Sequence, residues 1–330
     1  MKLTVDLKTS PYDIVIEKGA LNRAGKELNL DRKVMIVTDS GVPEEYAKEI
    51  ASQSKEGVIE TIIMGEGSKE LGTYEALLSE LLNNDFTRKD CIVAVGGGVV
   101  GDLAGFVAAS YMRGIDFYNV PTTVLASVDS SIGGKTAVNF QGVKNIVGAF
   151  YQPKKVLIDP DVFVSLPKRQ ISNGLSEAVK MSLTFDKELF EQFEKGVNFN
   201  DLTEIIYKSL DIKRIVVEAD EKENGLRKVL NFGHTLGHGI EVSSGGKLLH
   251  GESVALGMLR MCSEPVKERL TKVLEMLNLP TEFDFDKEKA MNAISHDKKS
   301  NGATISTIYV REVGKYEIRE MTLDELKERL

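Results

Sequence analysis

The 330-residue chain has no tryptophan and only two cysteines, and it has no apolar run long enough for a membrane span. Because a transmembrane helix needs about 20 apolar residues in succession, we expect no membrane partner. Cys91 and Cys262 are too few for the disulfide framework of a small secreted protein. The N-terminal segment alternates apolar and polar residues and does not resemble an export signal. These absences predict a soluble, cytoplasmic protein.

An excess of positive charge is also missing. The 42 Lys and Arg residues are outnumbered by 50 Asp and Glu residues, which gives a formal net charge of −8. A general nucleic-acid binder presents a basic face, so we expect no nucleic-acid partner. A hydrophobic content of 42% excludes a disordered polymer. Because one hydrophobic core rarely serves more than about 250 residues, the length predicts two domains.

The first half of the chain alternates short apolar strands with helical segments. This alternation predicts a parallel sheet that is covered by helices on both faces. Helices are expected at 21–28, after Pro43, at 74–82 and after the glycines 96–98. The expected strands are 3–6, 12–16, 33–38, 58–64, 91–95, 117–120 and 155–158.

The second half is mainly helical in composition and period. Helices are expected at 186–194, 202–217, 253–277 and 323–330, and another is expected to start near 174–180. Residues 305–310 and 315–317 are typical of a small hairpin. The fold class that we predict is an α/β domain with a parallel sheet over 1–165, followed by a mainly α-helical domain over 166–330.

A glycine loop follows the strand at 91–95. Gly96, Gly98 and Gly101 satisfy the pattern G-x-G-x-x-G between a strand and a helix. Glycine lets the backbone approach a phosphate closely, and the helix N-terminus supplies N–H groups. In an ordinary dinucleotide fold the acid that binds the ribose comes after this loop, whereas here the best candidate, Asp39, precedes it. The pattern predicts an anion cradle, with a tight turn of small residues as the structural alternative.

Three of the four histidines lie in one short window. His234 and His238 are four residues apart, hence on one helical face, and His250 follows. Imidazoles at this spacing suit a divalent metal, which usually takes a carboxylate as well, and Glu177 is a candidate. A surface or helix-capping pair is the alternative interpretation of an isolated HxxxH motif.

Lysine, arginine and asparagine residues recur in segments that also carry glycine. In an acidic protein, such cations beside a metal would suit a substrate with phosphate and carboxylate groups. A single basic residue is more often solvated surface. The residues concerned are Arg113, Lys135, Lys144, Asn145, Lys180, Lys213, Arg227 and Asn231.

Taken together, these motifs resemble those of 3-dehydroquinate synthase. They occur in that family's order and with nearly its spacing, from about Asp39 to Lys299. The segments that carry the resemblance are 96–102, 120–135, 144–153, 174–180, 225–238 and 250–252.

The resemblance implies a Rossmann-like, NAD-binding domain over 1–165 and a helical metal- and substrate-binding domain over 166–330, with the active site in the cleft between them. The reaction implied is the conversion of 3-deoxy-D-arabino-heptulosonate 7-phosphate to 3-dehydroquinate and phosphate, a lyase step of the shikimate route to chorismate and the aromatic amino acids. NAD⁺ is reduced and regenerated within each turnover. The family also implies a homodimer.

Site residues follow from the resemblance position by position. The implied metal ligands are Glu177, His234 and His250, holding zinc, with cobalt as the alternative. The implied NAD contacts are Asp39, Glu66, Lys69, Gly97, Gly98, Val99, Val100, Gly101, Asp102, Thr122, Thr123, Lys135, Lys144, Phe163 and Ser165. The implied substrate contacts are Asp129, Lys135, Asn145, Lys180, Lys213, Arg227, Asn231, His238 and one of Lys298 and Lys299, of which we favour Lys299. Arg113 would reach the phosphate, from the partner subunit of the dimer.

The family chemistry explains these residue types. A metal on neighbouring hydroxyls lowers the pKa of the one to be oxidised by NAD⁺. The transient ketone acidifies the adjacent C–H, so phosphate can leave while lysine and arginine stabilise its charge. Reduction, ring opening and aldol closure follow. Few acid–base residues are needed, because the phosphate of the substrate can take the proton.

Three other functions are weighed against this one. A metal-dependent polyol dehydrogenase would need no clamp for phosphate and carboxylate, and it typically has serine where this chain has Val99. Another sugar-phosphate cyclase would diverge at Arg227, Asn231 and His238. A non-catalytic NAD-binding scaffold would have lost the metal triad. One departure from the family stands out: the stretch from His250 to the segment 277–280 is about ten residues short and contains Pro265, which casts doubt on the helix packing behind the metal.

Overall fold

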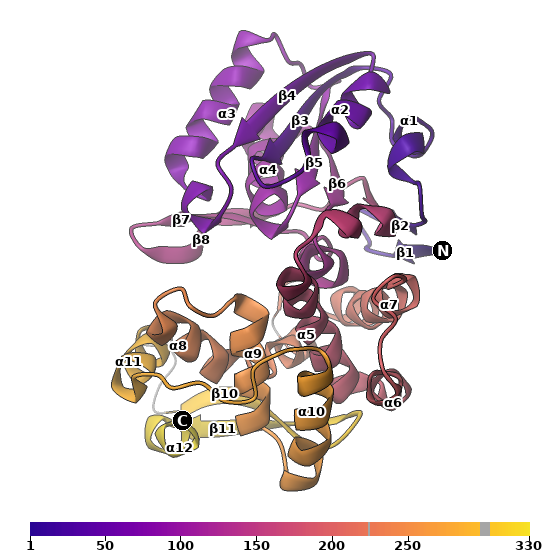
Figure 1. Ribbon diagram of the computed structural model, residues 1–330. Helices are drawn as coiled ribbons and strands as arrows, with labels where there is room; N and C mark the ends of the chain where they lie inside the picture. Colours follow the sequence, from indigo (N-terminus) through magenta and orange to yellow (C-terminus); the bar gives the residue numbers. More distant parts are fainter. Residues whose placement is uncertain (224, 298–303) are drawn as a thin grey trace. The chain divides into compact units, whose positions relative to one another are not determined.

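The computed structural model describes residues 1–223, 225–297 and 304–330 (Figure 1). These residues divide into two compact units, Met1–Leu166 and Pro167–Leu330. No helix in the described part of the chain is long and apolar enough to cross a membrane. Lys298 and Lys299, one of which is expected to contact the substrate, lie outside the described residues.

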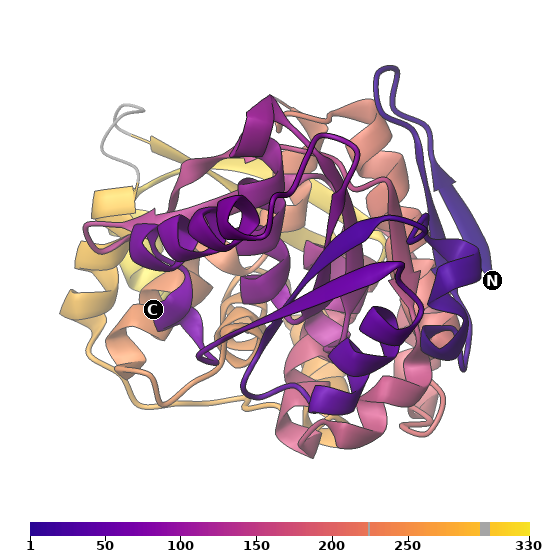
Figure 2. The ribbon, with the colours of Figure 1, turned by 90° about the horizontal axis from the view of Figure 1, so that it is seen from above.

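Unit 1, Met1–Leu166, is built on a seven-stranded sheet with the strand order β1-β2-β9-β6-β5-β3-β4. Only the pair β1–β2 is antiparallel, and Figure 2 shows these two strands together beside the N-terminus. The strands are β1 (Lys2–Val5), β2 (Tyr12–Ile16), β3 (Lys33–Asp39), β4 (Glu56–Ile62), β5 (Cys91–Gly96), β6 (Asp116–Pro121) and β9 (Lys155–Ile158).

Helices cover both faces of this sheet, as the alternating pattern predicts. Every residue of the interior strand β5 is buried, which is typical of a parallel strand covered on both sides. The helices α3 (Leu71–Asn83) and α4 (Gly98–Ser110) share one core with strand residues such as Met35 and Ile92. The helix α2 (Glu44–Ser52) packs on β3 and β4 with buried Ala47 and Ile50. The remaining helical pieces are η1 (Leu21–Arg23), α1 (Ala24–Glu27), η2 (Glu66–Ser68), η3 (Tyr111–Arg113), η4 (Ala126–Ser130) and η5 (Pro160–Ser165).

A second, two-stranded sheet in unit 1 was not predicted. Strands β7 (Lys135–Phe140) and β8 (Val143–Phe150) form an antiparallel hairpin. Its inner face packs on α4, where a Cβ added to Gly105 would lie 2.5 Å from the Thr136 methyl carbon. Most residues of β8 are exposed, and its apolar residues do not alternate with polar ones in the period of two by which a half-buried strand is recognised.

Unit 2, Pro167–Leu330, is mainly helical. The order of elements is α5 (Lys168–Phe185), α6 (Lys187–Lys195), α7 (Thr203–Ala219), η6 (Leu226–Asn231), α8 (His234–Ser244), α9 (His250–Arg260), α10 (Glu264–Met276), α11 (Lys287–Asp297), the hairpin of β10 (Thr304–Glu312) and β11 (Lys315–Thr322), and α12 (Leu323–Arg329). A mostly parallel sheet followed by a helical region confirms the predicted fold class.

Two helix predictions in unit 2 are wrong in extent. The helix expected to start near 174–180 begins at Lys168, so Glu177 lies in the middle of α5, 14 of whose 18 residues are buried. The helix expected over 253–277 is two helices, because the chain turns after Arg260 and α10 begins with Pro265 in its first turn. A proline there loses no helical hydrogen bond, and α10 buries Val266 and Leu270 in the core.

We predict that Gly105→Ala destabilises unit 1. An alanine in a helix is normally more stable than a glycine, by about 1 kcal/mol. Here the added Cβ would lie 2.5 Å from Thr136 and 3.2 Å from the Phe117 ring, so we expect a net loss of about 1–3 kcal/mol from overpacking. Urea unfolding measures it. Gly67→Ala, where a Cβ meets nothing within 4 Å, is the control, and a more stable Gly105→Ala variant would contradict the close packing.

Candidate active site

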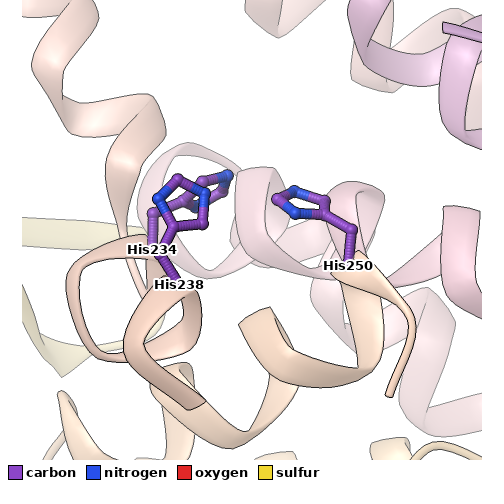
Figure 3. Close-up of side chains that lie close together, drawn as sticks. All are labelled: His234, His238 and His250. Atoms are coloured by element: carbon purple, nitrogen blue, oxygen red, sulfur yellow. The ribbon is translucent and has the colours of Figure 1, made fainter. Parts of the chain in front are cut away.

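Three histidines gather at the N-terminal turns of α8 and α9. His234 and His238 lie one turn apart on α8, and His250 opens α9. Figure 3 shows the three imidazoles together. One nitrogen from each lies within 4.8 Å of the others, which is close enough for one metal ion. The helical face predicted from the spacing of His234 and His238 is therefore present, and the fold adds His250 to it.

Glu177 reaches the same place from α5. Its side chain is 0% exposed, and its Oε1 lies 3.7 Å from His234 Nε2 and 3.6 Å from His250 Nε2. Among the described residues, Glu177 Oε1 has no hydrogen-bonding partner, while Lys180 forms an ion pair with Oε2. A buried carboxylate that faces two imidazole nitrogens fits a divalent cation of the zinc or cobalt class.

The charges of the cluster favour metal binding. Burial alone would raise the pKa of Glu177, but the Lys180 ammonium holds that pKa well below its usual range. Burial and Lys180 together push the pKa of His234 well below its ordinary value. Glu177 is therefore a carboxylate and His234 a neutral imidazole at neutral pH, and these are the forms that bind a metal.

His250 differs from His234 in its protonation. Burial lowers the pKa of His250, but Glu177 and Glu241 outweigh this effect and raise the pKa to about 9. Without a cation, His250 therefore carries a proton at neutral pH. A bound cation would replace that proton.

The second nitrogen of each of these two rings is held by the protein. His250 Nδ1 lies 3.1 Å from Glu241 Oε2, and His234 Nδ1 lies 3.2 Å from the carbonyl oxygen of Phe232. Both contacts turn the Nε2 atoms toward Glu177. Such partners fix the orientation of metal-binding histidines.

Glu241 was not predicted from the sequence. A signal for it was present, because Glu241 follows His234 and His238 with helical spacing on α8.

A tight contact between α5 and α9 sets the position of His250. The backbone N–H of Gly251 donates to Asn173 Oδ1 at 2.7 Å. A Cβ at Gly251 would lie 2.0 Å from the Asn173 carbonyl oxygen. Glu252 caps the same turn by accepting from the Leu249 N–H, and Arg169 of α5 donates to both of its carboxylate oxygens. The first turn of α9 is thus fixed to the helix that carries Glu177.

The glycine loop lies at the carboxyl edge of the sheet in unit 1. Gly96 ends β5 and Gly98 begins α4. A Cβ at Gly97 would lie 3.2 Å from Thr123 and one at Gly98 3.1 Å from Ser130, so larger side chains would crowd these neighbours, and both glycines are half-buried. The N–H groups at the start of α4 suit a phosphate.

Asp39 meets this loop in space although it precedes it in the sequence. It ends β3, which is the parallel neighbour of β5, so both carboxyl ends lie at the same edge of the sheet. Thr122 joins them, because its N–H donates to the Gly96 carbonyl oxygen at 2.9 Å. Ligands of open α/β sheets bind at this edge.

The other predicted NAD contacts are spread over unit 1. Val99, Val100, Gly101 and Asp102 lie on α4, Glu66 and Lys69 in and after η2, Lys135 and Lys144 on the β7–β8 hairpin, Thr123 after β6, and Phe163 and Ser165 in η5. Lys69 lies 2.5 Å from Asp102 and 2.5 Å from Asn145, which links a predicted NAD contact to a predicted substrate contact.

The predicted substrate contacts lie in both units. Lys180, Lys213 and Arg227, from α5, α7 and η6, are 2–5% exposed. Burying a cation is costly unless it is paired, and Arg227 donates to the Glu221 carbonyl oxygen while Lys180 pairs with Glu177. His238 and Asn231 are exposed in unit 2, and Arg113, Lys135 and Asn145 are exposed in unit 1, where Asp129 lies on η4.

We predict that Gly251→Ala disrupts the histidine cluster. The added methyl group would overlap the Asn173 carbonyl oxygen and lie 2.2 Å from Ser176 Oγ, so α9 must move away from α5 and carry His250 with it. We expect the free energy of unfolding to fall by about 1–3 kcal/mol or more and the affinity for Zn²⁺ to fall as well. Urea unfolding and competition with a chelator measure the two effects. Unchanged values, like those expected for Gly67→Ala, would contradict this account of the contact.

Two family models match the chain: the N-terminal model of 3-dehydroquinate synthase over residues 59–173 and its C-terminal model over 174–300. A 3-dehydroquinate synthase from Streptococcus thermophilus is 45% identical, with 100% of this chain and 99% of the relative covered. That alignment extends over 354 positions, so this chain, with 330 residues, is the shorter one by about two dozen positions.

Solved structures also resemble the chain. A 2-deoxy-scyllo-inosose synthase, solved with carbaglucose-6-phosphate, NAD⁺ and Co²⁺, has a TM-score of 0.90 at 27% identity, with 99% of this chain and 98% of that chain covered. The 2-epi-5-epi-valiolone synthase of Streptomyces hygroscopicus, with NAD⁺ and Zn²⁺ bound, has a TM-score of 0.88 at 24% identity, covering 98% of this chain and 97% of that chain, and shows the same fold.

Both family models and the full-length relatives agree on one activity. The predicted enzyme, a 3-dehydroquinate synthase of the shikimate pathway, is confirmed over the polyol dehydrogenase, the other cyclases and the scaffold. The chain belongs to the 3-dehydroquinate synthase family.

Proposed function

We propose that this enzyme binds a divalent cation, zinc or cobalt, through Glu177, His234 and His250. The observation that carries the proposal is the buried Oε1 atom of the Glu177 carboxylate, which has no hydrogen bond among the described residues and faces two imidazole nitrogens. Relatives of the same fold bind Co²⁺ or Zn²⁺ together with NAD⁺.

His238 is the alternative third ligand, since its ring belongs to the same cluster. Two features favour Glu177. It is close to both His234 Nε2 and His250 Nε2, and a buried anion gains more from a cation than an exposed imidazole does. We assign exposed His238 to the substrate instead.

NAD⁺ would bind in unit 1 and the cation in unit 2. The Gly96–Asp102 loop would hold the pyrophosphate, and Asp39 at the neighbouring strand end would accept hydrogen bonds from a ribose. The remaining NAD contacts predicted from the resemblance stay assigned to this unit. We also infer a cytoplasmic homodimer in which Arg113 reaches the phosphate of the substrate bound by the partner subunit.

When bound, the cation supplies a Lewis acid for a substrate hydroxyl, and NAD⁺ supplies the hydride acceptor. The chain itself contributes binding and charge. Buried Lys180, Lys213 and Arg227 offer ammonium and guanidinium N–H groups to the phosphate and carboxylate of the heptulosonate phosphate. These cations stabilise the negative charge that develops as phosphate leaves. His238 and Asn231 add hydrogen-bonding groups that orient the substrate.

We predict that chelation stops turnover. Purified enzyme should release phosphate from 3-deoxy-D-arabino-heptulosonate 7-phosphate without a net rise in NADH absorbance, because NAD⁺ is regenerated in each cycle. After treatment with a chelator, activity should be lost and should return with Zn²⁺ or Co²⁺. Phosphate release that persists without metal would overturn the cation proposal, and stoichiometric NADH would indicate a simple dehydrogenase.

We predict that the ligands and His238 respond differently to substitution. Glu177→Gln should lower Zn²⁺ affinity by at least about 100-fold, because the buried anion is lost. His238→Asn should change Zn²⁺ affinity by less than about 10-fold but still reduce phosphate release. Competition with a chelating dye measures the affinity, and Glu188→Gln, an exposed carboxylate on α6, is the control. The reverse pattern would make His238 the ligand.

A further inference from the structure

The β7–β8 hairpin of unit 1 contains an irregularity at a predicted site residue. Val138 pairs with Val147 and Phe140 with Val143. A single residue of β7, Asn139, is therefore opposite the three residues Lys144, Asn145 and Ile146. Such a β-bulge changes the direction of a side chain and is common beside active sites.

Asn145 occupies the bulge in an uncommon backbone conformation. Its φ is +56°, in the left-handed region that asparagine adopts more readily than most residues. The backbone N–H of Asn145 donates to Asn139 Oδ1 at 2.9 Å. The direction of the Asn145 side chain therefore depends on the groups that hold this bulge.

Lys69 holds the bulge from outside the hairpin. Its ammonium donates to Asn145 Oδ1 and, on the other side, to Asp102 Oδ2 of α4, each at 2.5 Å. The backbone of the same residue contributes too, since the Lys69 carbonyl oxygen accepts from the Asn139 N–H at 2.7 Å. One residue thus joins the bulge to the helix that begins at the glycine loop.

The burial of Lys69 makes this link rigid. The residue is 4% exposed, and a buried ammonium stays charged only if its partners stabilise it. Two of its three N–H donors are taken by Asp102 and Asn145. A lysine whose main task was to reach a nucleotide would not need both of these partners.

We propose that Lys69 is a positioning residue, which fixes the Asn145 side chain relative to α4 before the substrate binds. This inference rests on the proposed function, in which Asn145 contacts the substrate and the loop at the start of α4 contacts NAD⁺. The resemblance assigned Lys69 to NAD⁺ alone. Lys69 instead connects α4, which begins at the nucleotide loop, with the proposed substrate contact Asn145. It acts on the substrate through Asn145.

A double-mutant cycle on the full-length enzyme tests the proposal. Lys69→Met removes the ammonium but keeps the length of the side chain, and Asn145→Gly removes the side chain without strain at positive φ. With the wild-type Asn145, Lys69→Met should lower kcat/KM for the heptulosonate phosphate about 10- to 100-fold, because a misplaced contact costs this much. With Asn145→Gly already present, the further loss should be less than about threefold.

The alternative is that Lys69 contacts only the nucleotide, and it predicts a different result. A nucleotide contact alone would give the same loss of kcat/KM with either residue at 145, together with a higher Kd for NAD⁺ by calorimetry, and this result would overturn the proposal. Lys55→Met, an exposed lysine of the same unit, is the matched control. If Lys69→Met fails to fold, Lys69→Gln, which keeps an N–H donor but not the charge, enters the same cycle with the same criterion.

Hydrogen exchange makes the test independent of the reaction. In Lys69→Met, the amides of residues 143–147 should exchange faster than in the wild type, while those of α5 should not change. Unchanged exchange at 143–147 would overturn the proposal even if turnover were lost. If the wild-type enzyme released no phosphate from the heptulosonate phosphate, the proposed function would fail, whereas the exchange result would still decide the role of Lys69.

Discussion

Burial of the Glu177 carboxylate is the constraint on which the site in unit 2 depends. A full negative charge at 0% exposure is unfavourable unless positive charge is close to it. Lys180, from the same helix, and the protonated imidazole of His250 supply this charge, while His234 faces the carboxylate as a neutral ring. His250 also pairs with Glu241 of α8. Electrostatic attraction, in addition to contacts between apolar faces, therefore holds the helices α5, α8 and α9 together.

The two candidate sites of the chain are built from different kinds of chemical group. The site in unit 1 is made by the absence of side chains, since glycines expose the backbone N–H groups at the end of β5 and the start of α4. The site in unit 2 is made by charged side chains in a place that water would otherwise solvate. A substitution in the first site acts mainly through volume, and a substitution in the second mainly through charge.

The features that could be predicted from the sequence are patterns of residues that lie close together along the chain. G-x-G-x-x-G after an apolar strand and two histidines four residues apart are patterns within one or two turns of chain, and both lie where expected. The proposed metal ligands could be assigned from the sequence only through the family resemblance, because Glu177 is far from His234 along the chain. The mostly parallel sheet followed from its buried strands.

Other features depend on contacts between distant segments and left little trace in the sequence. The exposed strand β8 lacks a regular alternation of apolar and polar residues, and its bulge is held by Lys69, 76 positions before Asn145. The start of α5 at Lys168 was missed because the helix follows Pro167 and has polar residues in its first turn. The contact of Arg169 with Glu252 joins two helices that no local pattern connects.

The short first turn of α9 has a thermodynamic consequence. It carries His250, the close contact of Gly251 and the cap made by Glu252, so an ion held by His250 also secures the packing of α9 on α5. A ligand that binds only the folded form stabilises that form. Saturation with metal should therefore make α9 harder to separate from α5 within Pro167–Leu330.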